Sequence, residues 1–305
     1  MDIYLPVAEM AVSLNTIIGL GVAVGILSTV FGVGGGFLAT PFLVFLGVPA
    51  SFAVGTQAVQ LISTSLSGVI GHWRKGSVDF KLGSVMLAGS FTGTILGILI
   101  FKLLQYTGHI DVVINALYVL LLGAVGGMML YESFSAILKK KHRAEASRSK
   151  FWLRATSGLP YTMMFSKSNL SISALVPIIL GVITGLMVSV LGIGGGFLVV
   201  PAMIYILGMP TSLVVGTSMF QILITTSLSA LLHIISNNTV DLLLAFILMV
   251  GALIGNQVGS RLSPYVRGAT ARLMLALILL GVCFMLWENL FIEPVEHFST
   301  EVLDK

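Results

Sequence analysis

The chain has 305 residues, of which 56% are hydrophobic and only 9% are charged, and its formal net charge is +4. Soluble domains carry about 25% charged residues, so this composition excludes an ordinary soluble protein and indicates a membrane protein with several spans. The one cysteine, Cys283, excludes an internal disulfide and a zinc cluster. The densest cluster of positive charge lies in one loop, which does not suggest a nucleic-acid partner.

Ten apolar segments follow one another along the chain. They fall at about 12–31, 35–47, 51–72, 82–101 and 112–131, and again at about 171–191, 195–207, 212–235, 242–260 and 272–290. The polar segment between the two sets holds seven Lys or Arg between positions 139 and 154. We therefore expect an N-terminal transmembrane repeat at 1–131, a basic cytoplasmic linker at 132–170, a C-terminal transmembrane repeat at 171–292 and an acidic tail at 293–305.

Two of these segments are shorter than a membrane span. Spanning takes about 20 helical residues, whereas 35–47 and 195–207 would be about 20 Å long at a rise of about 1.5 Å per residue. Each of them starts at a glycine triplet. The predicted fold is an all-α integral membrane protein with two repeats of about five apolar helical segments, one of them short and glycine-broken, giving eight to ten segments in all.

The second half of the chain repeats the first. Residues 31–41 read FGVGGGFLATP and residues 191–201 read LGIGGGFLVVP, an offset of 160. The match continues as GVPASFAVGTQAVQ at 47–60 and GMPTSLVVGTSMFQ at 208–221. His72 then matches His233, and GSVDF at 76–80 matches NTVDL at 238–242 with drifting gaps. Two glycine-broken hydrophobic units in one membrane chain are typical of a transporter whose site lies where the repeats meet.

The distribution of Lys and Arg predicts how the repeats are oriented. Cytoplasmic loops carry the Lys/Arg excess, and only an odd number of crossings per repeat puts Arg74, the linker and Arg261 on that side. Five crossings satisfy this rule, and so does a re-entrant hairpin of the first two segments followed by three crossings. In both cases the two repeats are inverted relative to each other, and both termini lie outside.

The glycine triplets are the first candidates for a binding site. Helix propensity cannot explain them, because each glycine costs about 1 kcal/mol relative to alanine. They expose the first N–H groups of the next helix inside the membrane, where such donors must line a wet cavity or bind something. Together with the helix dipole, these donors favour an anion, although a tight turn or a helix crossing is an alternative. The candidates are Gly34, Gly35, Gly36, Gly194, Gly195 and Gly196.

Neutral polar side chains follow each triplet at matched positions. They can donate hydrogen bonds to an oxyanion, or they can hold membrane helices together. These substrate-binding candidates are Thr56, Gln57, Gln60, Thr217, Ser218 and Gln221. For the hydroxyl runs that follow at 63–67 and 225–229, helix packing is the favoured explanation.

Other repeated features have simpler structural explanations. The glycines spaced by four over 89–97 and 251–259 lie along one helix face, which indicates close helix packing. Asn256, Gln257 and Arg261 on the second of these segments could still line a path. A titrating pair at His72 and His233 could couple protons to transport. Because the inverted topology places the two histidines at opposite faces, an ordinary interfacial position is favoured for them.

The acidic residues avoid the middle of every apolar span. Cation transporters usually need carboxylates within the membrane, so an anionic substrate is favoured. Asp79 and Asp241 are paired by the repeat and lie at helix starts, where N-terminal capping explains them. Paired carboxylates, clustered histidines and a GxxxxGK[ST] sequence are missing from the chain. We therefore expect no enzyme activity, catalytic residue, metal site or cofactor, and a secondary transport mechanism.

At these residues the chain resembles the sulfite exporter TauE/SafE family, also called the toluene sulfonate uptake permease family. The most specific parts are GVGGGFLATP with GVPASFAVGT, and GIGGGFLVVP with GMPTSLVVGTS. The resemblance implies a multi-pass permease of the cytoplasmic membrane that moves sulfite, sulfonates or related organic anions. The expected partners are a small anion and the lipid bilayer, and a homodimer is compatible with the sequence.

Export is favoured over uptake, because an inside-negative potential of about 100 mV drives an anion out by about 2.3 kcal/mol per charge. An uptake permease for an organic anion is the alternative. A non-transporting membrane enzyme or scaffold is less well supported, since neither explains the repeated glycine breaks.

Overall fold

The computed structural model describes residues 2–5, 7, 10–31, 36–138, 161–262 and 269–291. The first half consists of a two-stranded antiparallel hairpin and five helices: β1 (Asp2–Leu5), β2 (Met10–Ser13), α1 (Leu14–Phe31), α2 (Gly36–Phe45), α3 (Ala50–Arg74), α4 (Phe80–Tyr106) and α5 (Ile110–Leu138). The second half has the same order: β3 (Thr162–Phe165), β4 (Leu170–Ser173), α7 (Leu175–Leu191), α8 (Gly196–Tyr205), α9 (Thr211–Leu232), the π-helix η1 (His233–Asn237), α10 (Leu242–Leu262) and α11 (Ala269–Phe291).

Each of the ten predicted apolar segments overlaps one α-helix, and the segment 212–235 also includes the start of η1. The two segments with glycine triplets form the short helices α2 and α8. The two β-hairpins were not predicted, because strands of four residues give almost no periodic signal. Helix α5 continues to Leu138 and β3 begins at Thr162, so both edges of the predicted linker at 132–170 have regular structure.

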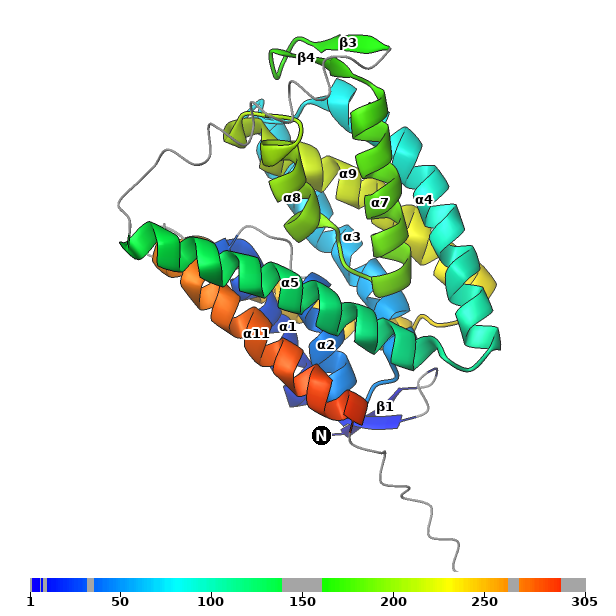
Figure 1. Cartoon of the computed structure of the whole chain (residues 1–305). Coiled ribbons are helices and arrows are strands. Elements are labelled where there is room, and N and C mark those ends of the chain that lie inside the picture. Colours follow the sequence, from blue (N-terminus) through cyan, green and yellow to red (C-terminus); the bar gives the residue numbers. More distant parts are fainter. Residues whose placement is uncertain are drawn as a thin grey trace, which may run out of the picture.

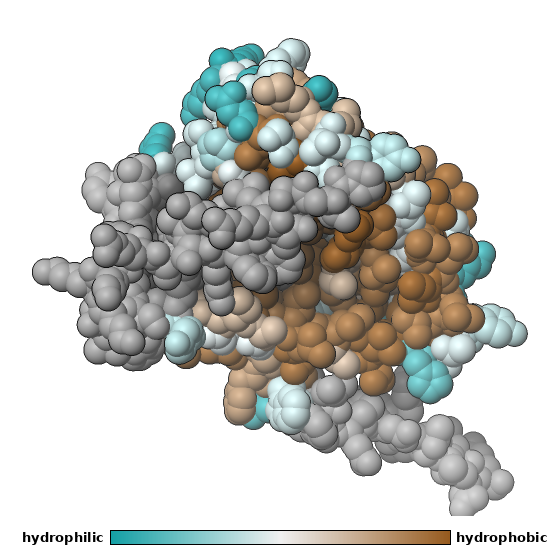
Figure 2. Space-filling model, turned by 45° about the horizontal axis from the view of Figure 1, so that its top comes forward, coloured by the Kyte–Doolittle hydropathy of each residue, from teal (hydrophilic) through white to brown (hydrophobic). Residues whose placement is uncertain are grey.

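The helices are apolar enough to lie in a membrane. In the described part of the chain, four helices meet the length and hydropathy of a span, within Phe80–Tyr106, Ile110–Tyr131, Thr211–Asn237 and Leu242–Leu262. Shorter apolar helices lie at Leu14–Val30, Gly36–Phe45, Leu175–Leu191 and Leu273–Glu288. Large hydrophobic side chains such as Leu99 and Phe246 are exposed on the outer helices. Figure 2 shows that the hydrophobic surface is broad and that hydrophilic residues gather toward one end of this face. The chain is therefore a multi-pass membrane protein.

The helices of the two halves pack on one another reciprocally. The first helix of each half lies against the fourth helix of the other, giving the pairs α1–α10 and α4–α7, while α3 packs on α9 and α5 packs on α11. In Figure 1 the α5–α11 pair crosses the front of the molecule, and the two hairpins lie at opposite ends. The core is therefore built between the halves rather than within each of them.

Glycines make the α1–α10 and α4–α7 contacts close. A Cβ added at Gly89 or Gly93 would collide with the carbonyl oxygens of Ile178 or Val182 in α7. On the other pair, a Cβ at Gly251 would lie 2.7 Å from the carbonyl oxygen of Ile18 in α1. Backbone meets backbone at these points, so the prediction of close helix packing is confirmed.

Candidate functional site

The two glycine breaks meet in the centre of the molecule. A Cβ added at Gly36, the first residue of α2, would lie 3.0 Å from the Gly194 nitrogen and 2.7 Å from Leu61 Cδ1. A Cβ at Gly194 would lie 3.0 Å from Leu61 and 3.6 Å from Ile222. The breaks therefore approach each other between α3 and α9, although Gly34 and Gly35 lie outside the described residues.

The second glycine break separates two helices sharply. Helix α7 ends at Leu191, and Gly192 follows in the left-handed conformation at φ +64°. Gly195 has φ +65° and is the N-cap of α8. Both values fall in a region that side chains with a Cβ rarely adopt, so these two glycines have a conformational reason to be there. Helix α8 therefore begins at this turn, and the first N–H groups of a helix have no partner within the helix itself.

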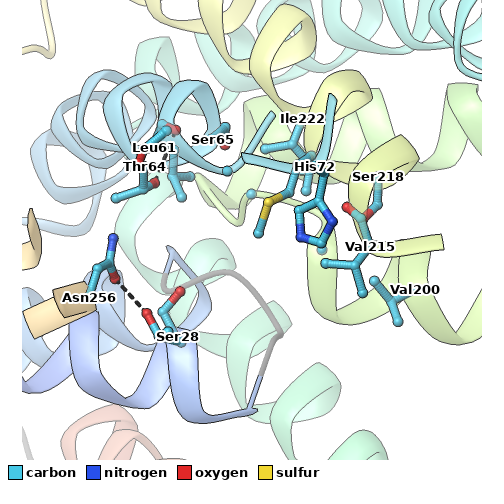
Figure 3. A pocket seen from close by; sticks show the side chains of 16 residues that line it. Ser28, Leu61, Thr64, Ser65, His72, Val200, Val215, Ser218, Ile222 and Asn256 are labelled. Carbon is cyan, nitrogen blue, oxygen red and sulfur yellow. Dashed lines mark hydrogen bonds between the residues drawn. The ribbon is translucent and has the colours of Figure 1, made fainter. Parts of the chain in front are cut away.

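A cavity of about 280 Å³ extends from this meeting point. Leu61, Ser65, Gly68 and His72 line it from one face of α3, so it runs about 16 Å along that helix at about 1.5 Å per residue. Its opposite walls come from α1, α8, α9 and α10, and Figure 3 shows His72 on one side with Ser28 and Asn256 on the other. The lining residues are Ser28, Thr29, Leu61, Thr64, Ser65, Ser67, Gly68, His72, Gly194, Gly196, Val200, Val215, Ser218, Met219, Ile222 and Asn256.

Eight of the sixteen lining residues carry a polar side chain, and none of the lining residues is acidic. Hydroxyl groups of serine and threonine, the amide of Asn256 and the His72 imidazole provide neutral hydrogen-bonding groups. Thr29 Oγ1 donates to Asn256 Oδ1 at 2.9 Å, and the amide nitrogen of Asn256 points away from that bond in Figure 3. Such a cavity can hold a small anion by hydrogen bonds without bringing a counter-charge into the membrane.

Three of the predicted site residues line the cavity: Gly194, Gly196 and Ser218. Gln57 lies outside the lining and is fully buried, and neither its Oε1 nor its Nε2 has a hydrogen-bond partner among the described residues. Gln60 Oε1 is also buried without a partner. Buried amides are costly when unpaired, so these two glutamines remain candidates for a ligand or for bound water.

Gln221 is held by its neighbours. Its Nε2 donates to Ser90 Oγ at 2.9 Å and to Thr184 Oγ1 at 2.7 Å, which connects α9 with both α4 and α7. Its Oε1 is buried and has no partner among the described residues. The amide nitrogen of Gln221 therefore takes part in helix packing, whereas its amide oxygen is not used in this packing.

Thr56 and Thr217 connect the repeats. The backbone nitrogen of Asp241 donates to Thr56 Oγ1 at 3.1 Å, and that of Asp79 donates to Thr217 Oγ1 at 2.9 Å. Both threonine side chains are fully buried. Their hydrogen bonds in this structure are structural, and a role in substrate binding stays a prediction.

The two aspartates are N-caps, as predicted. Asp79 Oδ1 accepts from Leu82 N at 3.1 Å, and Asp241 Oδ1 accepts from Leu244 N at 3.0 Å. Their second oxygens accept from the hairpin of the other repeat: Ser168 Oγ donates to Asp79 at 2.5 Å, and Val7 N donates to Asp241 at 3.2 Å. Each aspartate thus holds together a helix start, a helix of the other half and a hairpin.

Sequence reasoning assigned several of the lining residues to other roles. Ser65 and Thr64 belong to a hydroxyl run assigned to helix packing, and His72 was assigned to the interface, yet all three line the cavity. His233 is fully buried with both ring nitrogens hydrogen-bonded. The spacing of His72 was the available signal, because His72 follows Ser65 by two helical turns and residues 61, 65, 68 and 72 share one side of a helix.

A bundle of apolar helices around a cavity that carries neutral polar side chains, at the junction of two repeats, is the arrangement of a membrane transporter. The chain belongs to the sulfite exporter TauE/SafE family, whose model matches residues 17–286. It is 29% identical to the probable membrane transporter protein YunE of Bacillus subtilis over 284 residues, covering 89% of this chain and 97% of the relative. It is 31% identical to the probable membrane transporter protein YjnA of the same organism over 266 residues, covering 87% and 96%. No solved structure matches the chain.

Proposed function

We propose that this protein is a secondary transporter of small sulfur-containing anions such as sulfite or a sulfonate, that it lies in the cytoplasmic membrane, and that it works in export. The observation that carries the proposal is the cavity beside the meeting glycine breaks, with neutral donors and no acid in its lining. A cation would need carboxylates in such a site. The description of the family as sulfite exporters supports the sulfur oxyanion as substrate.

The cavity leads toward the basic end of α3. His72 lies at its far end, and the exposed Arg74 and Lys75 follow two and three residues later. Lys and Arg are concentrated on the cytoplasmic side of membrane proteins, so the cavity opens to the cytoplasm in this proposal. An anion from the cytoplasm would meet positive charge first and neutral donors next, and the inside-negative potential would drive its exit.

The two repeats are inverted in this proposal. The reciprocal pairs α1–α10 and α4–α7 and the placement of the two hairpins at opposite ends support the inversion. Inverted repeats place a substrate site at their interface near the middle of the membrane, and the approach of Gly36 to Gly194 supports a site at that interface.

Sulfite efflux from proteoliposomes tests the proposal, with Ser65→Ala as the decisive variant. The Ser65 side chain lines the cavity, and its hydroxyl has no hydrogen-bond partner among the described residues. A hydrogen bond to a charged group is worth about 1.5–3 kcal/mol, so we expect the KM for sulfite to rise by about tenfold or more.

Ser63→Ala is the matched control, because Ser63 lies on the same helix and outside the cavity lining. Its KM should stay within twofold of the parent. If Ser65→Ala and Ser63→Ala had the same KM for sulfite, the cavity would not be part of the transport path. Transport of a cation, or sulfite transport only when ATP is supplied, would contradict the proposed function itself.

A further inference from the structure

His72 and His233 are equivalent in the repeat but differ in what surrounds them. His72 lines the cavity, and its Nδ1 is buried without a hydrogen-bond partner in the described part of the chain. His233 Nε2 lies 2.9 Å from the carbonyl oxygen of Ser189 in α7. A carbonyl oxygen can only accept, so Nε2 of His233 carries the proton and Nδ1 is left as an acceptor.

The remaining contacts of His233 close this end of the molecule. Asn237 Nδ2 lies 3.2 Å and Thr239 Oγ1 lies 3.3 Å from His233 Nδ1. The ring packs edge-on against Phe101, with the two centroids 4.6 Å apart and an interplanar angle of 81°. The imidazole therefore ties the end of α9 to α7 and to α4.

The repeat identifies the partner that His72 would have in the same arrangement. Ser189 precedes its glycine break as Thr29 precedes the first one, at the offset of 160. The two residues are also alike locally, since Ser189 Oγ donates to the Gly185 carbonyl at 2.8 Å and Thr29 Oγ1 donates to the Gly25 carbonyl at 3.0 Å. Thr29 and His72 both line the cavity, from different helices.

Repeat-related side chains thus line a cavity at one end of the molecule and are packed against other residues at the other end. Ser65, Ser218 and His72 line the cavity. Their repeat equivalents, in that order, are Thr226, Gln57 and His233, and none of these lines the cavity. Ser65 and Ser218 are themselves only 6% and 2% exposed, so the two ends differ in the cavity beside these side chains and not in their exposure. The sequence is nearly symmetric at these positions, whereas the packing around them is not.

We propose that His72 and Thr29 form the gate that closes the cavity: the His72 imidazole donates to the Thr29 carbonyl oxygen when the His233–Ser189 contact opens at the other end. The proposal rests on the proposed transport function, because a transporter must expose one site to two faces in turn. If the His233–Ser189 contact breaks and the His72–Thr29 contact forms, the cavity closes at one end and opens at the other. The new contact is of the same kind as the one that is lost.

The helix pairs provide the bodies that would move. In α1–α10 and α4–α7 backbone carbonyls contact glycines directly, which makes each pair a stiff unit. Thr29 belongs to the first unit and Ser189 to the second, while both histidines lie at the ends of α3 and α9. A small rotation of α3 and α9 between the two units would break one histidine contact and make the other.

Thiol accessibility tests the gate without any substrate. In a Cys283→Ser background, Thr226→Cys reports opening at the far end, because Thr226 is fully buried in the present packing. Its rate of reaction with a water-soluble maleimide measures the population of the alternative state. His233→Ala should raise that rate about fivefold, the factor expected for one net hydrogen bond, and His72→Ala should lower it by a similar factor.

His109→Ala is the matched control, since His109 is exposed in the turn between α4 and α5. It should leave the rate unchanged. A general loosening of the protein would raise the rate in every variant, so the fall expected for His72→Ala separates a gate from a loss of packing. An unchanged rate in folded His72→Ala overturns the proposal.

A cysteine pair provides a second test that does not disturb the core near His233. Thr29→Cys with His72→Cys should form a disulfide under mild oxidation and stop transport until reductant is added. Failure of the pair to cross-link would overturn the gate. If the thiols behave as expected but no sulfur anion is carried, the substrate assignment fails and the gate remains.

Discussion

At the scale of single residues, equivalent positions in the two repeats share their chemistry only where the packing is also shared. Thr56 and Thr217 accept the same kind of backbone hydrogen bond from Asp241 and Asp79. His72 and His233 do not share surroundings, because one lines a cavity and the other reaches Ser189. The sequence predicts both pairs equally well, but it carries no information on which end of the molecule is closed.

Among the acidic residues, substitution of the capping aspartates is predicted to lower the stability of the protein most. Asp241→Ala removes the acceptor for Leu243 N and Leu244 N and leaves Val7 N without its partner. Loss of an N-cap costs about 0.5–2 kcal/mol, so the melting temperature in detergent should fall by several degrees. Asp241→Asn keeps an acceptor oxygen at the cap and should lose less than half as much. A greater fall in melting temperature for Asp241→Asn would mean that the negative charge of Asp241, and not its role as a cap, stabilises the protein.

At the scale of helices and strands, apolar segments and turn residues were sufficient to predict the helices and not their irregularities. Pro49 and Pro210 precede α3 and α9, and the glycine triplets precede α2 and α8, as the sequence suggests. The offset between the repeats changes from 161 at His72 and His233 to 162 at Gly76 and Asn238. The additional residue is accommodated by the π-helix His233–Asn237. One extra residue inside a helix is what produces such a π-bulge, but a gap in the alignment of two repeats does not say which structure absorbs it.

The short hairpins show a different limit. Their strands pair only four residues each, and they are held in place by contacts with the other half of the chain, such as Ser168 with Asp79. Local sequence cannot predict an element whose stability comes from so distant a partner.

Helix pairing supports a prediction on the glycines. A Cβ at Gly93 would collide with the carbonyl of Val182, so Gly93→Ala should separate α4 from α7 and destabilise the protein by about 1–3 kcal/mol, as overpacking does. Gly127 in α5 has nothing within 4 Å of an added Cβ. Gly127→Ala should be neutral or stabilising by up to about 1 kcal/mol, because alanine favours the helix. Thermal denaturation of both variants in detergent measures the difference, and equal melting temperatures would contradict the close α4–α7 contact.

At the scale of the whole molecule, the reciprocal pairs of helices account for how two similar halves make one core. The repeat was visible in the sequence, but which helices pair was not, since apolar faces that meet across the halves resemble those that face lipid. The exposed hydrophobic residues of α4 and α10 illustrate this, because both helices are apolar on their buried and their outer sides.

The orientation of the whole chain in the membrane can be tested with single cysteines. If the two repeats are inverted relative to each other, the two ends of the chain should lie outside and the basic segment 139–154 inside. In a Cys283→Ser background, Ile3→Cys and Ser299→Cys should react with a membrane-impermeant maleimide in intact cells. Ser147→Cys should react only after the membrane is permeabilised. Protection of either terminal cysteine in intact cells would overturn the odd number of crossings per repeat.

The crossed aspartate contacts have a consequence for biosynthesis. When the ribosome has completed α5, Asp79 has neither Ser168 nor Thr217 to bond, and the glycine face of α4 has no α7 to cover it. The first half therefore stays in the bilayer without these contacts until the second half is inserted. Its early helices are completed by residues made last, so this membrane protein reaches its native state as one cooperative unit and not as two halves in succession.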